Sequence, residues 1–144
     1  MTPPTYPKLV SDEFPCVVYY EDTDFTGFVY HANYLKFCER AREHLIGIPV
    51  LRTFFEVGLH FVVRDIHARF TSPARHGDHL IVKSEVELKP NPRLIFRQTV
   101  VRTDCDHSEK KIFIAEIHVA VLDANNKPVR LPQWAIDKIG SASI

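Results

Sequence analysis

The sequence has no excess of charge of either sign and no long hydrophobic run. Eighteen basic and eighteen acidic residues give a formal net charge of zero. This balance gives no indication of a strongly charged partner such as a nucleic acid. No apolar run approaches the about 18–20 residues of a membrane span, and Met1–Ser11 lacks the apolar core of a signal peptide. We therefore expect a cytoplasmic protein with no membrane span and no nucleic-acid partner.

Cysteine is scarce, and so are candidate metal ligands in a recognisable pattern. The cysteines Cys16, Cys38 and Cys105 are odd in number and show no CxxC spacing. Reduced thiols in a cytosolic protein are the simplest interpretation. His76 and His79 fall in a predicted turn without a firm metal partner, and we predict no metal.

The first third of the chain predicts a strand, an acidic loop and a helix. No repeat or linker divides residues 1–144, which are expected to form a single domain with a loose lead-in at 1–12. A strand is expected at Phe14–Tyr20, an acidic loop at 21–30 and a helix at 31–47. The apolar face of that helix follows the helical spacing: Tyr34, Phe37, Cys38, Ala41, Leu45 and Ile48.

The rest of the chain predicts four more strands. They are expected at Leu59–Phe70, Leu80–Leu88, Leu94–Arg102 and Ile112–Leu122, with further helical segments at 51–57 and 132–139. In the first of these strands the alternation changes phase at Arg64-Asp65, which predicts a bulge. Short turns between consecutive strands favour antiparallel neighbours, so we expect an α+β fold with the helix packed on one curved sheet. The strand at 112–122 is apolar on both faces, which indicates homo-oligomerisation.

The step from the acidic loop into the long helix has a chemical consequence. The first N–H groups of a helix have no intrahelical partner and carry the positive end of its dipole. They suit a developing oxyanion, and a carboxylate held a few residues upstream suits a base or a nucleophile. A strand–Asp–helix arrangement therefore favours cleavage of an ester or a thioester.

The same residues resemble a known family. Asp22-Thr23-Asp24, Gly27, Val29-Tyr30-His31, Asn33-Tyr34 and Glu39-Arg40-Ala41-Arg42 are similar to the signature of hot-dog-fold acyl-CoA thioesterases. The resemblance is to the 4-hydroxybenzoyl-CoA thioesterase family, and within it to the Tol-Pal-associated, YbgC-like subgroup. Supporting similarities are Phe61-Val62-Val63-Arg64, Ser72-Pro73-Ala74-Arg75 with Asp78, and Leu131-Pro132. The resemblance covers roughly residues 14–137 and implies the hot-dog fold, one long helix wrapped by a curved antiparallel sheet.

The resemblance also implies an activity and its catalytic residues. The expected reaction is hydrolysis of an acyl-CoA thioester, or of an acyl-carrier-protein thioester, to free acid and thiol. Asp24 occupies the position of the catalytic aspartate, as base or nucleophile, and His31 lies where the helix N-terminus polarises the carbonyl. No cofactor is expected, because coenzyme A is part of the substrate. Family members are dimers or dimers of dimers with active sites between protomers, so a homotetramer is expected.

Six further residues are implied in substrate binding. Gly27 permits close approach of the backbone, Asn33 braces the loop, and Tyr30 and Tyr34 line or pack behind the acyl pocket. Coenzyme A carries phosphates, for which Arg75 and Arg93 are candidates. Most of the basic run that the aromatic-acyl members carry before the fourth strand is missing here, which leaves carrier-protein thioesters open.

Several alternatives remain at this level. Spacing alone favours Asp24 as a turn or helix cap over a catalytic role. The acidic loop also partly matches an EF-hand or an Asp-x-Asp phosphotransferase motif. Glu39 looks like part of a solvated helix face, but it is also a second candidate base. A hydratase on the same fold is a rival, although its histidine motif is not found. The alternative from another class is a non-catalytic acyl-thioester-binding or envelope-associated interaction module.

Overall fold

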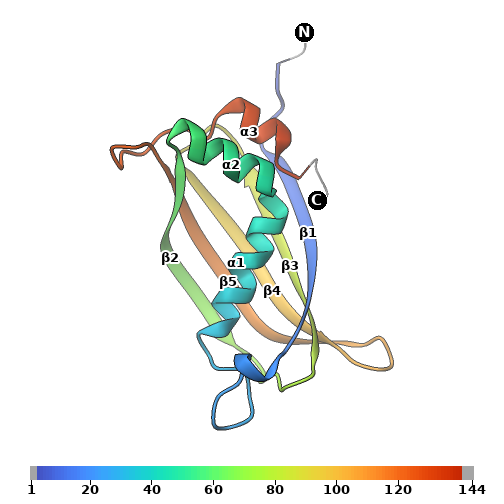
Figure 1. The fold of residues 1–144 in the computed structure, drawn as a ribbon. Coiled ribbons are helices and arrows are strands. Elements are labelled where there is room, and N and C mark those ends of the chain that lie inside the picture. Colours follow the sequence, from blue (N-terminus) through green and yellow to red (C-terminus); the bar gives the residue numbers. More distant parts are fainter. Residues whose placement is uncertain (1–2, 141–144) are drawn as a thin grey trace.

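The strands form one curved antiparallel sheet, and the longest helix lies across its inner face (Figure 1). The computed structural model describes residues 3–140. The elements are β1 Lys8–Val17, α1 Asn33–Ile46, α2 Ile48–Val57, β2 His60–Phe70, β3 His79–Leu88, β4 Arg93–Thr103, β5 Glu109–Leu122 and α3 Gln133–Lys138. The strand order in the sheet is β1-β3-β4-β5-β2. The predicted α+β class is confirmed.

Helix α1 buries the face that the apolar spacing predicts, with one exception. Its buried residues are Tyr34, Phe37, Cys38, Ala41, Leu45 and Ile46, and they pack on β1, β3 and β4. Gly47 ends the helix at a φ of +95°, a conformation that favours glycine, and α2 starts at the next residue. The chain turns at this point, so Ile48 is 46% exposed and Ile46 takes its predicted place in the core.

Strand β3 alternates strictly between the core and the outer face of the sheet. Leu80, Val82, Ser84, Val86 and Leu88 are buried. Strand β2 behaves differently, because it lies at one edge of the sheet and most of its residues are exposed. Its register against β5 shifts between Val63 and Asp65, which confirms the predicted bulge.

The N-terminal strand begins earlier than the sequence predicts. The expected range was Phe14–Tyr20, whereas β1 runs from Lys8 and ends at Val17, so the loose lead-in does not extend to residue 12. Pairing with β3 from Lys8↔Leu88 to Val17↔His79 supplies hydrogen bonds that local composition does not reveal. Because β1 is the other edge strand, Pro15 lies at a sheet edge as expected.

The connection from β2 to β3 crosses the sheet. Consecutive strands were expected to be neighbours, but β2 and β3 lie at positions separated by β4 and β5. The crossing segment 71–78 therefore passes against the loop that follows β1, where the Val29 N–H donates to the Ala74 carbonyl over 2.9 Å. This contact joins the crossing segment to the acidic loop, which leads directly into α1 (Figure 1).

None of the helices within residues 3–140 is both long enough and apolar enough to cross a membrane.

Candidate active site at the start of helix α1

Asp24 lies in a tight turn at the base of the acidic loop. The Asp24 N–H donates to the Phe28 carbonyl, and the Gly27 N–H donates to the Asp24 carbonyl, both over 3.0 Å. One carboxylate oxygen, Oδ1, accepts hydrogen bonds from the Thr26 N–H over 2.8 Å and from the Thr26 hydroxyl over 2.5 Å. Within residues 3–140, no donor hydrogen-bonds the other oxygen, Oδ2. The turn therefore fixes the carboxylate through one oxygen and leaves the second available.

Gly27 is needed for its backbone conformation. Its φ is +84°, in the left-handed region where a side chain is strained. A Cβ built at this position would meet no atom within 4 Å. The turn geometry therefore requires a glycine here, and the space beside Gly27 is free of other protein atoms.

Asp22 and Asn33 hold the acidic loop against the helix. The Asp22 carboxylate accepts a hydrogen bond from the Tyr19 N–H over 2.8 Å, and Asp22 is only 8% exposed. The Asp22 carbonyl accepts from both the Tyr30 N–H and the Asn33 side-chain amide, each over 2.9 Å. Asn33 is the first residue of α1, so this amide ties the loop directly to the helix start.

His31 lies just before the helix rather than in it. Helix α1 begins at Asn33 with Ala32 as its cap, two residues later than the sequence predicts. No acceptor in the described part of the chain takes a hydrogen bond from the His31 N–H, whereas the Asn33 N–H donates to the Tyr30 carbonyl. The centre of the His31 ring lies 4.5 Å from that of Tyr30, with the two ring planes tilted by 51°, and 6.4 Å from that of Phe70, which it meets edge-on.

Asp24 and His31 line the same surface pocket of about 360 Å³. Tyr34 forms part of its wall, buried to 3% exposure, and its hydroxyl accepts a hydrogen bond from the Ala74 N–H over 3.0 Å. The other lining residues are Thr26, Phe28, Val29, Phe70, Thr71, Ser72 and Pro73. We call this site the Asp24 pocket.

The surroundings of Asp24 favour its ionised form. Its pKa is lowered chiefly by the Thr26 hydroxyl and then by the Thr26 N–H, with a smaller contribution from the charge of His31. Donors that bind the carboxylate stabilise the charged state, so Asp24 is a carboxylate at neutral pH. An anionic oxygen in the same pocket as the unpaired His31 N–H is the arrangement expected for a base or nucleophile.

The two candidate arginines lie far apart in the structure. Arg75 belongs to the crossing segment 71–78. Its backbone forms an isolated antiparallel β-bridge with Phe28, and its guanidinium lies 5.1 Å from the centre of the Phe28 ring. Arg93 begins β4 and pairs with Ala120, at the end of the sheet away from the acidic loop. Of these two candidates, Arg75 is the one near the Asp24 pocket.

The competing interpretations of the acidic loop meet structural obstacles. A strand, β1, and a short 3₁₀ helix at Tyr20–Asp22 precede Asp24, whereas an EF-hand needs a full helix there. The sheet is antiparallel, whereas the phosphotransferase interpretation needs a doubly wound parallel one. Glu39 is exposed as expected, but within residues 3–140 it makes no ion pair, and it lines a different cavity.

Thr26 and Phe70 were not among the residues predicted for the site. Thr26 donates twice to Asp24, and a hydroxyl residue two positions after an aspartate is a recognised local signal for such a turn. Phe70 ends β2 and reaches the pocket only through the sheet topology, so no local signal marks it.

Comparison with known proteins gives a consistent result. Residues 18–139 match the family model of the thioesterase-like superfamily. A curated relative from Haemophilus influenzae, named acyl-CoA thioesterase YbgC, is 37% identical over 124 residues, covering 83% of this chain and 88% of the relative. The crystal structure of a "probable thioesterase" from Bartonella henselae is 33% identical and covers 85% of this chain and 99% of its own, with a TM-score of 0.67.

A more distant structure shows the fold. The 4-hydroxybenzoyl-CoA thioesterase from Pseudomonas sp. strain CBS-3 has a TM-score of 0.78 at 18% identity, covering 89% of this chain and 98% of its own. The family match spans most of the chain, including the Asp24 loop, helix α1 and all strands after β1. The chain therefore belongs to the thioesterase-like superfamily and has its hot-dog fold.

Proposed function

We propose that this protein hydrolyses acyl-CoA thioesters to a free acid and coenzyme A. The observation that carries the proposal is that an open Asp24 oxygen and the unpaired His31 N–H, just before α1, belong to the lining of one pocket. The superfamily and the name of the Haemophilus relative agree with this activity.

The proposed reaction uses Asp24 and the helix start in separate roles. The free Oδ2 takes a proton from a water molecule, whose oxygen attacks the thioester carbonyl carbon. The negative charge that develops on the carbonyl oxygen is held by the N–H groups around His31. When the tetrahedral intermediate collapses, the carbon–sulfur bond breaks and the thiolate leaves without a strong acid, since thiol pKa values are about 8.5. A direct attack by Asp24, through a mixed anhydride, uses the same Oδ2.

The binding groups follow from their position. Arg75 lies beside the Asp24 loop and suits a phosphate of coenzyme A, whereas Arg93 needs a second copy of the chain to approach this pocket. The buried Tyr34 lines the acyl site directly, whereas Tyr30, which is 44% exposed, acts from outside the pocket lining through its ring contact with His31. Acyl-carrier-protein thioesters are the second substrate class, and the reaction needs no metal and no cofactor beyond the substrate itself.

The test compares Asp24→Asn with a structurally matched control. Asp106 lies in another exposed turn, where its Oδ1 accepts from the Ser108 N–H over 3.0 Å and from the Ser108 hydroxyl over 2.6 Å, as Asp24 does with Thr26. Thiol release would be measured with acyl-CoAs of two to eighteen carbons, benzoyl-CoA and phenylacetyl-CoA. We expect Asp24→Asn to lose about 10²–10⁴-fold in turnover, and Asp106→Asn to keep the wild-type rate.

Other results would change the proposal in defined ways. Equal turnover by the wild type and a folded Asp24→Asn would remove Asp24 from the mechanism. Negligible release by the wild type from every acyl-CoA would lead to the same panel on acyl carrier protein. Failure there would leave the non-catalytic binding module.

We also propose that the protein is a homo-oligomer in the cytoplasm, a dimer through β2 that assembles further to a tetramer. β2 is a long edge strand that exposes Val62, Val63, Ile66 and Phe70 at 36–55%. An uncovered edge with apolar side chains is a template for pairing with another strand, and a second copy supplies an identical one.

Proline substitution tests this pairing, because proline removes one backbone N–H. Along a strand the N–H groups point alternately to the two sides, so Ile66→Pro and His67→Pro would remove donors on opposite sides of β2. The variant that loses the outward donor is expected to stay folded and to have half the mass of the wild-type unit in light scattering. A monomeric wild type, or two folded variants with wild-type mass, would contradict the proposal.

A further inference from the structure

Most hydroxyl groups that line the Asp24 pocket are committed to hydrogen bonds within the protein. The Thr26 hydroxyl donates to the Asp24 carboxylate over 2.5 Å. The Thr71 hydroxyl donates to the Lys111 carbonyl over 2.8 Å. The Tyr34 hydroxyl accepts a buried backbone N–H over 3.0 Å. These three groups hold the walls of the pocket in place.

The hydroxyl of Ser72 lines the same pocket and has no such role. Ser72 is half-buried, and its hydroxyl makes no hydrogen bond with any group in residues 3–140. Serine hydroxyls in turns commonly bond a backbone group of a neighbouring residue. Because this one does not, it is available to a molecule inside the pocket.

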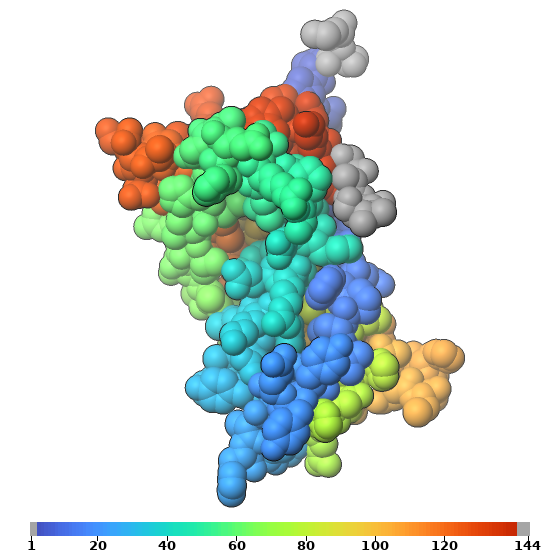
Figure 2. Space-filling model, viewed as in Figure 1, coloured from blue at the N-terminus to red at the C-terminus, as the bar shows by residue number. Residues whose placement is uncertain are grey.

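The backbone on both sides of Ser72 is fixed. The Ser72 N–H donates to the Ile112 carbonyl of β5 over 3.2 Å. The next residue, Pro73, restricts the backbone of Ser72 to extended conformations, and the Ala74 carbonyl accepts the Val29 N–H over 2.9 Å. Figure 2 shows the crossing segment, in yellow-green, against the blue acidic loop at the same end of the molecule. The Ser72 side chain therefore starts from a rigid part of the pocket wall.

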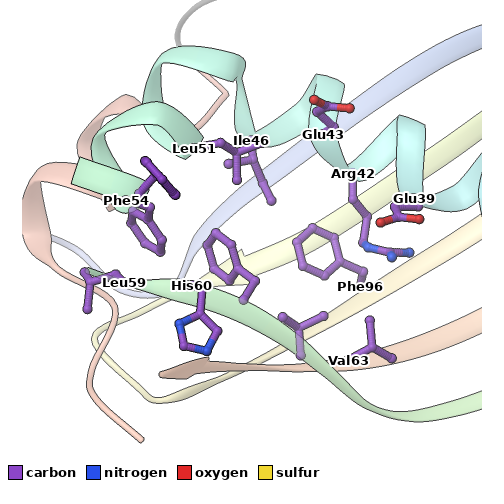
Figure 3. Close-up of a pocket in the computed structure, with 13 residues that line it drawn as sticks. Glu39, Arg42, Glu43, Ile46, Leu51, Phe54, Leu59, His60, Val63 and Phe96 are labelled. Carbon is purple, nitrogen blue, oxygen red and sulfur yellow. The ribbon is translucent and has the colours of Figure 1, made fainter. Parts of the chain in front are cut away.

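The charged residues of a larger cavity do not reach the Asp24 pocket. That cavity, of about 430 Å³, lies between α1, α2 and β2, and Figure 3 shows Glu39, Arg42 and Glu43 of α1 in its lining. It shares no lining residue with the Asp24 pocket. Within one chain, the polar contacts of a molecule beside Asp24 therefore come from the Asp24 pocket itself.

A water molecule that attacks a thioester has two hydrogens to place. Asp24 Oδ2 accepts one of them, and a second acceptor fixes the direction in which the water oxygen points. A serine oxygen can accept this hydrogen. His31 is the other lining residue whose side chain makes no hydrogen bond in the described part of the chain. A protonated imidazole has only donors, which suit the carbonyl oxygen of the thioester rather than the water.

We propose that Ser72 holds the attacking water together with Asp24, its Oγ accepting one hydrogen of the water while Asp24 Oδ2 takes the other as a proton. The water oxygen bonds to the thioester carbonyl carbon, and the hydrogen at Ser72 stays on that oxygen. When the carbon–sulfur bond breaks, Asp24 returns its proton to the thiolate. This assignment rests on the proposed hydrolysis, and within it Asp24 acts as a base rather than as a nucleophile.

The test compares Ser72→Ala with the wild type on the acyl-CoA that the wild type turns over fastest. Loss of one hydrogen bond to the water should lower kcat about threefold to tenfold and leave KM unchanged, because the contact acts on the water and not on the substrate. Ser72→Thr keeps a hydroxyl and should recover most of the turnover. Ser11→Ala removes an exposed hydroxyl of β1, outside the pocket, and should keep the wild-type kcat.

Two further measurements separate this role from a disturbance of the turn. Ser72 makes no hydrogen bond to Asp24, so the acidic limb of the pH–rate profile should lie at the same pH in Ser72→Ala and in the wild type. In a single turnover in water labelled with heavy oxygen, the label should enter the released acid and not the Asp24 carboxylate. A shifted acidic limb, or label in Asp24, would overturn the proposal.

The outcomes distinguish this proposal from the proposed function. An unchanged kcat in Ser72→Ala, or a change in KM alone, would overturn the role of Ser72 while Asp24-dependent hydrolysis stands. Negligible turnover by the wild type, or equal turnover by the wild type and Asp24→Asn, would overturn both.

Discussion

Tyr34→Phe separates a single hydrogen bond from the aromatic packing around it. The Tyr34 ring stacks on Phe113 at a centroid distance of 5.2 Å and meets Phe37 and Phe70 edge-on. Phenylalanine keeps those contacts and removes only the hydroxyl. That hydroxyl accepts the Ala74 N–H in a buried position, and burial raises its pKa, so it stays protonated at neutral pH.

The expected cost is that of leaving the Ala74 N–H buried and unpaired. Such a loss is worth about 1–3 kcal/mol of unfolding free energy. For a chain of this length, about 3–4 °C of melting temperature corresponds to each kcal/mol, so the expected decrease is about 3–12 °C. The Ala74 carbonyl also holds the Val29 N–H beside the Asp24 loop. We therefore expect slower thiol release as well, by less than in Asp24→Asn.

Calorimetric or circular-dichroism melting would measure the effect, with Tyr20→Phe as the control. Tyr20 is 80% exposed, and its ring meets only His76 edge-on among the aromatic contacts within residues 3–140. Loss of that hydroxyl should change unfolding free energy by no more than about 0.5 kcal/mol. A Tyr34→Phe protein that melts with the wild type would show that the Ala74 N–H finds another acceptor, and would refute the reasoning.

Three further predictions concern the Asp24 turn, two glycines and the buried amide of Gln98. Thr26→Ala removes the hydroxyl that contributes most to the lowered pKa of Asp24, so the pKa rises and the acidic limb of the pH–rate profile moves to higher pH, while Ser108→Ala leaves the profile in place. Gly27→Ala should lower the free energy of unfolding by about 1–2 kcal/mol, because alanine is strained at the positive φ of this position. Gly140→Ala should lower it further, because the new Cβ would also lie 2.5 Å from Val10 Cγ1, and equal melting temperatures of the two variants would contradict this. Gln98→Leu removes the amide that hydrogen-bonds the Cys38 carbonyl, the Ser84 hydroxyl and Arg42, and should lower the free energy of unfolding by about 2–4 kcal/mol in a denaturant titration. A decrease below about 0.5 kcal/mol would show that water replaces the amide.

The sequence predicted those elements whose own apolar periodicity identifies them. The 3.6-residue spacing of Tyr34, Phe37 and Ala41 predicted α1, because a helix needs only its own apolar face to show its period. The change of phase at Arg64-Asp65 predicted the β2 bulge for the same reason. Boundaries were less certain: β1 begins at Lys8, where pairing with Leu88 rather than local composition sets the end of the strand.

The sequence by itself determined the α+β class, the Asp–loop–helix order and the family, because each can be recognised from the order and local spacing of residues along the chain. Only the tertiary structure decided that β3 lies next to β1 and not β2, and that the crossing segment therefore supports the Asp24 loop. It also separated Arg75 from Arg93, and joined Arg42 to Gln98 across 56 positions of sequence. Such contacts depend on strand order and register, and no local pattern encodes which distant residues the sheet brings together.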